Sequence, residues 1–159
     1  MKLEFKEIED NQTWDNYVLQ MPEYSFLNSS ARYEYNKKIG IETFRYAIFN
    51  GDIFRGVLTG NIGFSKLFGR FLEFKHSPLL TGFEEEEWKQ VIKFAKQYAI
   101  DKKCFMFRFS PLVVEDPRIE EIYKKYHFIK APIHNVDALI SQQIDLTKNI
   151  EDLKKDMSK

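Results

Sequence analysis

The stretch Cys104–Pro111 constrains the fold more strongly than any other part of the sequence. It begins with four apolar residues, Cys-Phe-Met-Phe, and its aromatic content favours a strand over a helix. Pro111 closes it, because a proline removes a backbone donor from a sheet. A long amphipathic segment precedes this stretch, and a second helical pattern follows it. The sequence therefore predicts a strand, buried in a sheet, between two helices.

Length, charge and cysteine content exclude several classes of protein. The chain has 159 residues, which fits one domain, and its 15 phenylalanines supply apolar volume for a large core. Lysine plus arginine equal aspartate plus glutamate at 24 each, which argues against a general nucleic-acid binder. No apolar run approaches the ~20 residues of a membrane span, and the amino-terminal residues lack a signal-peptide core. The single cysteine fits a reducing compartment. We therefore expect a cytoplasmic protein that is not an integral membrane protein.

The first half of the sequence predicts a strand, two helices and a meander of strands. Alternation of apolar and charged residues opens the chain, and helical spacing follows as far as Pro22. Ser29 or Ser30 caps a second helix that ends at Gly40. The apolar stripe expected on that helix consists of Ala31, Tyr35 and Ile39. Asn50-Gly51 is a hairpin signal, because both residues tolerate positive φ. Glycines inside the returning strand, at positions 56, 60 and 63, indicate bulges or a close backbone approach.

The second half alternates helices and strands. Phe71–Phe74 predicts a strand, and Thr81–Glu84 fits a capping box at the start of a long helix. The apolar face of that helix consists of Trp88, Val91, Ile92, Ala95 and Ala99. Asp116-Pro117 begins another helix, Ile144–Leu146 predicts a short strand, and Asn149 caps a last helical turn. The predicted order is β-α-α-β-β-β-α-β-α-β, followed by the start of a helix.

This order is similar to that of the Gcn5-related N-acyltransferase (GNAT) fold, which is an α/β (α+β) fold with a mixed central sheet flanked by helices. The resemblance implies a sheet that splits between its fourth and fifth strands, here Phe71–Phe74 and Cys104–Phe109, with the acyl donor in the split. Coenzyme A-dependent members carry a Gln/Arg-x-x-Gly-x-Gly/Ala turn after the fourth strand, where backbone amides bind pyrophosphate. Residues 77–82 read Ser-Pro-Leu-Leu-Thr-Gly and precede four glutamates, so that motif is absent.

Few side chains form a recognisable constellation for chemistry. His76, His127 and His134 lack the spacing of metal ligands, although His76 stands at a strand end near the expected split. Cys104 fits a small core residue better than a nucleophile. Arg108 interrupts an apolar run, so it is solvated, paired with an acid or available to an anion. The pattern leaves the last two alternatives equally open.

Several short motifs, in order, resemble the first subdomain of the Fem-type peptidyltransferases (FemABX). Phe26-Leu27-Asn28-Ser29 is similar to a family helix start, and Lys75–Leu79 stands where the family has Arg-Gly-Pro. Phe107–Pro111 resembles the family's Ile-Arg-Ile-Asp-Pro strand. Later matches are Phe128, Asn135-Val136, Ile144–Lys148, Glu151–Leu153 and Met157. The sequence departs from the family at Arg32, where a tryptophan is usual, at His76-Ser77 and at Ser110, which replace the motif's Arg-Gly and Asp.

The Fem-type resemblance implies a function without coenzyme A or another cofactor. Such enzymes transfer an amino acid from aminoacyl-tRNA to the stem peptide of a peptidoglycan precursor, UDP-MurNAc-pentapeptide or its lipid-linked form. We expect residues 1–147 to form the GNAT-like domain and 148–159 to lead toward a second subdomain or a partner chain. The expected contacts with precursor phosphates or carboxylates are Lys37, His76 and Arg108, and no catalytic residue is assigned.

Two other functions are compatible with the sequence. One is a stand-alone GNAT N-acetyltransferase that uses acetyl-CoA, although the missing phosphate turn argues against it. The other is a non-catalytic GNAT-like module that binds a partner protein, for which exposed apolar surface and self-association are the expected signs.

Overall fold

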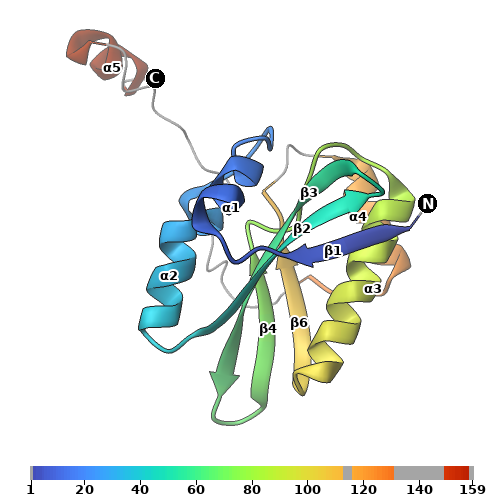
Figure 1. Ribbon diagram of the computed structural model, residues 1–159. Coiled ribbons are helices and arrows are strands. Elements are labelled where there is room, and N and C mark those ends of the chain that lie inside the picture. Colours follow the sequence, from blue (N-terminus) through green and yellow to red (C-terminus); the bar gives the residue numbers. More distant parts are fainter. Residues whose placement is uncertain (1, 113–115, 131–148, 158–159) are drawn as a thin grey trace. The chain divides into compact units, whose positions relative to one another are not determined.

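The computed structural model describes residues 2–112, 116–130 and 149–157 (Figure 1). Its residues form two compact units, Met1–Ile129 and Lys130–Lys159. The second unit contributes one described helix, α5 (Ile150–Met157), and Asn149 accepts a hydrogen bond from the Asp152 backbone at its start, as predicted. The predicted strand Ile144–Leu146 lies outside the described residues. All other elements below belong to the first unit.

A mixed sheet forms the centre of the first unit. Its strands are β1 (Leu3–Glu7), β2 (Glu42–Asn50), β3 (Ile53–Ser65), β4 (Gly69–Lys75), β5 (Leu79–Leu80) and β6 (Cys104–Ser110). The order is β1-β2-β3-β4-β6, and the short β5 pairs with β3. Every pairing is antiparallel except that of β4 with β6. Helices flank this sheet, so the predicted α/β fold class is confirmed.

Local sequence signals explain where the helices begin. The helices of this unit are α1 (Asn11–Val18), the 3-10 turn η1 (Phe26–Asn28), α2 (Ser30–Lys38), α3 (Glu85–Asp101) and α4 (Pro117–Lys125). Side chains of Asp10, Ser29 and Asp116 accept hydrogen bonds from free backbone N–H groups at the starts of α1, α2 and α4. Figure 1 shows α1 and α2 on one side of the sheet and α3 on the other.

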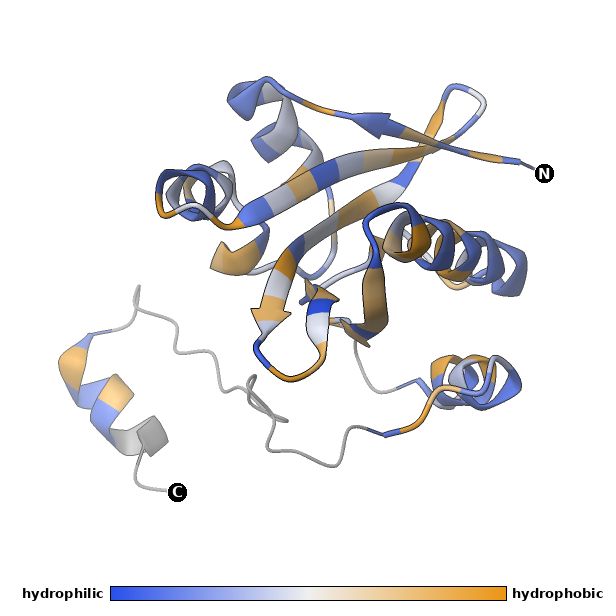
Figure 2. Cartoon of the chain, turned by 90° about the horizontal axis from the view of Figure 1, so that it is seen from below, coloured by the Kyte–Doolittle hydropathy of each residue, from blue (hydrophilic) through white to orange (hydrophobic). Residues whose placement is uncertain are grey.

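The main core lies between the sheet and α3. Alternate residues of β2, β3 and β4 turn toward this helix because successive side chains of a strand point to opposite faces. They bury Phe44, Ile48, Leu58, Ile62, Leu72 and Phe74 against Val91, Ala95 and Ala99. Figure 2 shows the alternation as bands of hydrophobic and hydrophilic colour along the strands. A second apolar cluster joins Trp14, Val18 and Met21 to Val57 and Leu79 on the α1 side.

One glycine prediction has a clear structural basis. At Gly56, a β-carbon would lie 2.2 Å from the carbonyl oxygen of Leu79 on the neighbouring strand β5, and the backbone has φ of 157°. Gly56 therefore permits the close backbone approach that the sequence indicated. The Asn50-Gly51 signal is also confirmed, because β2 and β3 form a hairpin around Gly51.

Two predictions about burial are wrong. Strand β6 is an edge of the sheet among the described strands, and Phe105 and Met106 at its start are exposed. On α2, Tyr35 and Ile39 of the predicted apolar stripe are exposed, as is Ala31, whereas Asn36 is buried. The helix thus turns polar residues toward the sheet, and this reversal positions the candidate site.

Two predictions about local geometry also need correction. The long helix begins after Glu84, whose side chain makes no capping hydrogen bond, so the capping box predicted for Thr81–Glu84 is absent. The expected split does not occur within β4 and β6, because their pairing continues from Arg70/Cys104 to Lys75/Ser110. The chain leaves this ladder only after Lys75, where it crosses to pair β5 with β3.

Candidate functional site

The sheet has one apolar face and one face with a polar region. The side chains opposite those of the main core come from β2, β3, β4 and β6 and lie on the α2 side. These are Thr43, Arg45, Thr59, Asn61, Glu73, Lys75 and Arg108. Helix α2 meets this region through hydrogen bonding, since Asn36 Nδ2 donates to Asn61 Oδ1 over 3.0 Å. A sheet face with this polarity is suited to hold a polar ligand.

A pocket lies between α2 and this polar region. Residues of α2 and of the segment before it line one side, and residues of β2, β3 and β4 line the other. Its polar lining residues are Asn28, Ser29, Arg32, Tyr33, Asn36, Thr43, Arg45, Thr59, Asn61 and Lys75, and Trp14 also contributes. The lining includes three cations, Arg32, Arg45 and Lys75, and no acidic residue among the described part of the chain. The pocket is therefore electrostatically suited to an anion.

Arg45 is the most deeply buried of these cations. Its guanidinium lies 4.1 Å from the centre of the Tyr33 ring and 5.6 Å from that of Trp14. Burial lowers the pKa of Arg45 from its ordinary value, which is high enough for arginine to stay charged at neutral pH. The nearest acids contribute only longer-range attraction, from Glu34, Asp15 and Asp10.

His76 follows β4 directly beside this pocket. Its Nδ1 lies 2.7 Å from Ser25 Oγ, and its carbonyl oxygen accepts a hydrogen bond from the Asn28 side chain. His76 has φ of 48°, a left-handed conformation that is uncommon outside glycine, and it turns the chain from β4 toward β5. The next residue, Ser77, is buried and its hydroxyl accepts from the backbone N–H of Thr59. The imidazole is thereby held at the end of the polar region.

The other two predicted contact residues are not part of the pocket lining and differ in their settings. Arg108 is ion-paired with Glu73 on the neighbouring strand, and its side chain is 34% exposed. The same carboxylate group lies 3.6 Å from Lys75 Nζ, so Glu73 links β6 to the pocket. Lys37 is exposed on α2, with its ammonium 5.3 Å from the centre of the Tyr33 ring. No residue of the pocket lining was predicted from the sequence as a ligand contact, although Asn28, Arg32 and Lys75 stand at positions of the family motifs.

The start of α3 is occupied by acidic residues rather than a phosphate-binding turn. Glu85, Glu86 and Glu87 form its first helical turn. Glu87 is 1% exposed and accepts two hydrogen bonds from Arg55 of β3, over 2.6 and 3.0 Å. These carboxylates stabilise the positive end of the helix. They would also repel a pyrophosphate placed there.

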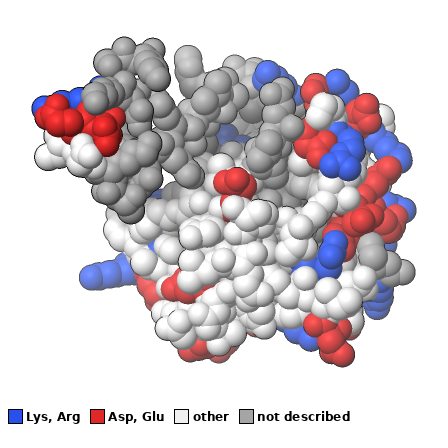
Figure 3. Space-filling view, turned by 90° about the horizontal axis from the view of Figure 1, so that it is seen from above, with Lys and Arg blue, Asp and Glu red and all other residues white. Residues whose placement is uncertain are grey.

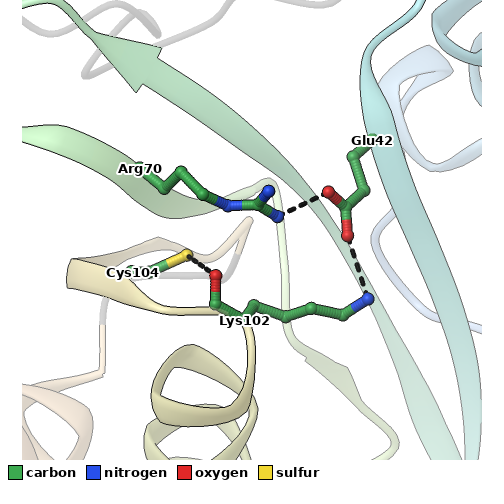
Figure 4. Close-up of polar contacts among 4 residues, drawn as sticks. All are labelled: Glu42, Arg70, Lys102 and Cys104. Carbon is green, nitrogen blue, oxygen red and sulfur yellow. Dashed lines mark hydrogen bonds and ion pairs between the residues drawn. The ribbon is translucent and has the colours of Figure 1, made fainter.

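Cys104 belongs to a structural cluster at the start of β6 (Figure 4). There Glu42 of β2 binds both Arg70 of β4 and Lys102, at the end of α3. Burial raises the pKa of the Cys104 thiol, so it stays protonated at neutral pH. This result agrees with the prediction of a small packing residue.

Metal and membrane features are absent from the described residues. These residues contain no group of three or more His, Cys, Asp or Glu side chains that could hold a metal ion. No described helix is long and apolar enough to cross a membrane. Figure 3 shows one face of the molecule, and its charged regions contain acidic and basic side chains side by side.

Comparison with known proteins identifies the fold. No protein-family model and no curated protein matches the sequence. Among solved structures, FemX matches 79% of this chain and 31% of its own, with 18% identity and a TM-score of 0.63. An aminoglycoside acetyltransferase from an uncultured soil metagenomic sample matches 89% of this chain and 100% of its own, with 12% identity and a TM-score of 0.62. A probable acetyltransferase matches 90% and 100%, with 17% identity and a TM-score of 0.58.

The chain has the GNAT acyltransferase fold. These three structural neighbours are two acetyltransferases and FemX, and at these identities the likeness concerns the fold alone. The chain spans about a third of the FemX chain and the full length of the two acetyltransferases.

Proposed function

We propose that this chain is the N-terminal part of a Fem-type aminoacyltransferase that acts on a peptidoglycan precursor. The observation that supports this most directly is the start of α3, where Glu85–Glu87 stand in place of a turn for coenzyme A pyrophosphate. The likeness to FemX over 79% of the chain and the ordered sequence motifs support the same family. In this proposal residues 1–147 act as the GNAT-like domain and 148–159 lead to a second subdomain or partner chain.

The proposed reaction joins an amine to an activated acyl group. A stem-peptide amine attacks the ester carbonyl of aminoacyl-tRNA, the carbon–nitrogen bond forms as the carbon–oxygen bond breaks, and the amine proton passes to the departing ribose oxygen. The protein's contribution would be to position the two substrates and stabilise developing charge. In this proposal Lys37, His76 and Arg108 contact phosphates or carboxylates of the precursor.

Calorimetric titration tests the proposal. We expect UDP-MurNAc-pentapeptide to bind and acetyl-CoA not to bind. Changing Lys37, His76 or Arg108 to Ala should weaken precursor binding, whereas Lys38→Ala, which removes an exposed charge from the same helix as Lys37, should not. Precursor affinity that is the same in all four variants would refute the assignment of the contact residues. Absence of precursor binding would refute the Fem-type function for this chain.

Two observations favour alternative functions. The chain covers the full length of two acetyltransferases, which favours a stand-alone enzyme using acetyl-CoA, and binding of acetyl-CoA alone in the same titration would establish it.

Exposed apolar residues gather at the β3–β4 turn and the start of β6, which favours a non-catalytic binding module. These are Phe64, Leu67, Phe68, Phe105 and Met106. Self-association in size-exclusion chromatography, with neither ligand bound, would support that module.

A further inference from the structure

Arg45 uses only part of its hydrogen-bonding capacity within the fold. A guanidinium has five N–H donors, one on Nε and two on each terminal nitrogen. Nε donates to the Ile8 carbonyl, and Nη2 donates to the Glu9 carbonyl and to Asn11 Oδ1. These three bonds hold the connection between β1 and α1. Nη1, by contrast, is buried and has no hydrogen-bond partner.

The charge of Arg45 also lacks a direct counter-ion. No carboxylate of the described residues lies within 4.0 Å of this guanidinium, although the side chain is completely buried. Its close neighbours are instead the rings of Tyr33 and Trp14. A buried charge without an opposite charge is costly, and leaving two N–H donors unsatisfied adds to that cost. A ligand that accepts hydrogen bonds and carries negative charge would remove both costs.

The pocket that Arg45 lines also contains two other cations and an unpaired acceptor. Arg32 and Lys75 line the same pocket and are both partly exposed, and Arg32 has no ion pair among the described residues. Asn36 Oδ1 is a buried acceptor without a partner and lines the pocket as well. The cavity volume is about 20 Å³, enough for one water-sized group. Only the head group of a larger ligand would therefore reach Arg45.

We infer that the pocket beneath α2 binds one oxyanion group, a carboxylate or a phosphate, with Nη1 of Arg45 as its buried contact and Arg32 and Lys75 as its outer contacts. The rest of the ligand passes Arg32 and Lys75 toward solvent. Asn36 Oδ1 favours an oxyanion that has a donor beside it, such as a protonated phosphate or a carboxylate next to an amine. The site is a property of this chain whichever acyl donor it uses, and it is tested by binding rather than by transfer.

The two tryptophans provide an internal comparison for that test. Trp14 lines the pocket, and its indole N–H donates to the Asn28 carbonyl over 2.7 Å. Trp88 lies on α3, in a cluster with residues of α4. We propose to titrate the full chain with acetate, glycine, inorganic phosphate and pyrophosphate at constant ionic strength, and to record both indole N–H resonances by NMR. We expect saturable movement of the Trp14 resonance, with a millimolar dissociation constant, and no movement of Trp88. The anion that binds most tightly distinguishes a carboxylate from a phosphate site.

Variants with a matched control make the result specific. Arg45 itself is left unchanged, because its other donors hold the β1–α1 connection. Arg32→Gln and Lys75→Gln should each weaken the best anion about tenfold, the effect of one charge-assisted hydrogen bond. Lys38→Gln removes a charge from the exposed side of α2 and should leave the affinity unchanged. The inference fails if no anion moves Trp14 saturably, if Trp88 moves equally, or if all three variants titrate like the wild type.

Discussion

The ion pair between Arg55 and Glu87 should contribute far more to stability than a neighbouring exposed pair. Glu87 is 1% exposed and Arg55 is 24% exposed, and two hydrogen bonds join them. Removing one partner of a fully buried pair costs about 3–5 kcal/mol, because the other charge is left without compensation. Since Arg55 retains some access to water, we expect Glu87→Gln to lower the free energy of unfolding by about 2–3 kcal/mol.

Glu85→Gln is the matched control. It makes the same substitution in the first turn of the same helix, and it breaks an ion pair with Lys125 that is exposed on both sides. Both variants remove one negative charge from the helix start, so the difference between them isolates burial. We expect Glu85→Gln to change stability very little.

Urea unfolding followed by tryptophan fluorescence measures this difference, because Trp14 and Trp88 both belong to the first unit. In thermal unfolding, the expected loss of unfolding free energy for Glu87→Gln would correspond to a fall in Tm of roughly 5–10 °C. Equal midpoints for the two variants would show that the buried pair contributes no more than an exposed one. Burial of Glu87 would then not strengthen its ion pair with Arg55.

Two further predictions concern acid stability and backbone packing. The hydrogen bond from Lys102 is the main cause that holds the pKa of Glu42 below its ordinary value of 4.5. The ionised Glu42 carboxylate therefore stabilises the folded protein fully above pH 4.5, and this contribution is lost as the pH falls through the lowered pKa. Acid unfolding should therefore be less steep in Glu42→Gln, and an unchanged profile would contradict the pairing. Gly56→Ala should cost at least ~3 kcal/mol or prevent folding, because its β-carbon would collide with the Leu79 carbonyl. Gly82→Ala meets no atom within 4 Å and should be nearly neutral, and equal urea midpoints for the two glycine variants would refute the close approach.

Most of the fold was predictable because local signals agree with it. Three helices begin at residue types that favour capping, namely Asp10, Ser29 and Asp116. The helical spacing of apolar residues also predicted which face of α3 is buried. The same reasoning failed for Phe105. A short apolar run cannot distinguish a central strand from an edge strand, since that depends on which other strands pair with it.

The pocket could not be recognised from the sequence for a different reason. Arg45, Asn61 and Lys75 alternate with core residues along their strands, and alternation of this kind normally indicates a face turned to water. Helix α2 was assigned an inward stripe centred on Tyr35 because apolar residues usually face the core. The one available signal was Asn36, but a single polar residue on a polar helix does not show which side is buried.

The polar inward face of α2 gives the strongest argument that this side of the sheet is built for binding. A helix that packs on a sheet gains stability mainly by burying apolar side chains. Here α2 instead buries Asn36, and it covers a region in which Arg45 Nη1 and Asn36 Oδ1 lack partners. Such groups reduce the stability of the unliganded protein, and a ligand that pairs with them recovers that free energy on binding. The prediction is that a bound oxyanion raises Tm in the wild type and in Lys38→Gln but only weakly in Arg32→Gln, and an equal rise in all three would attribute it to general salt effects.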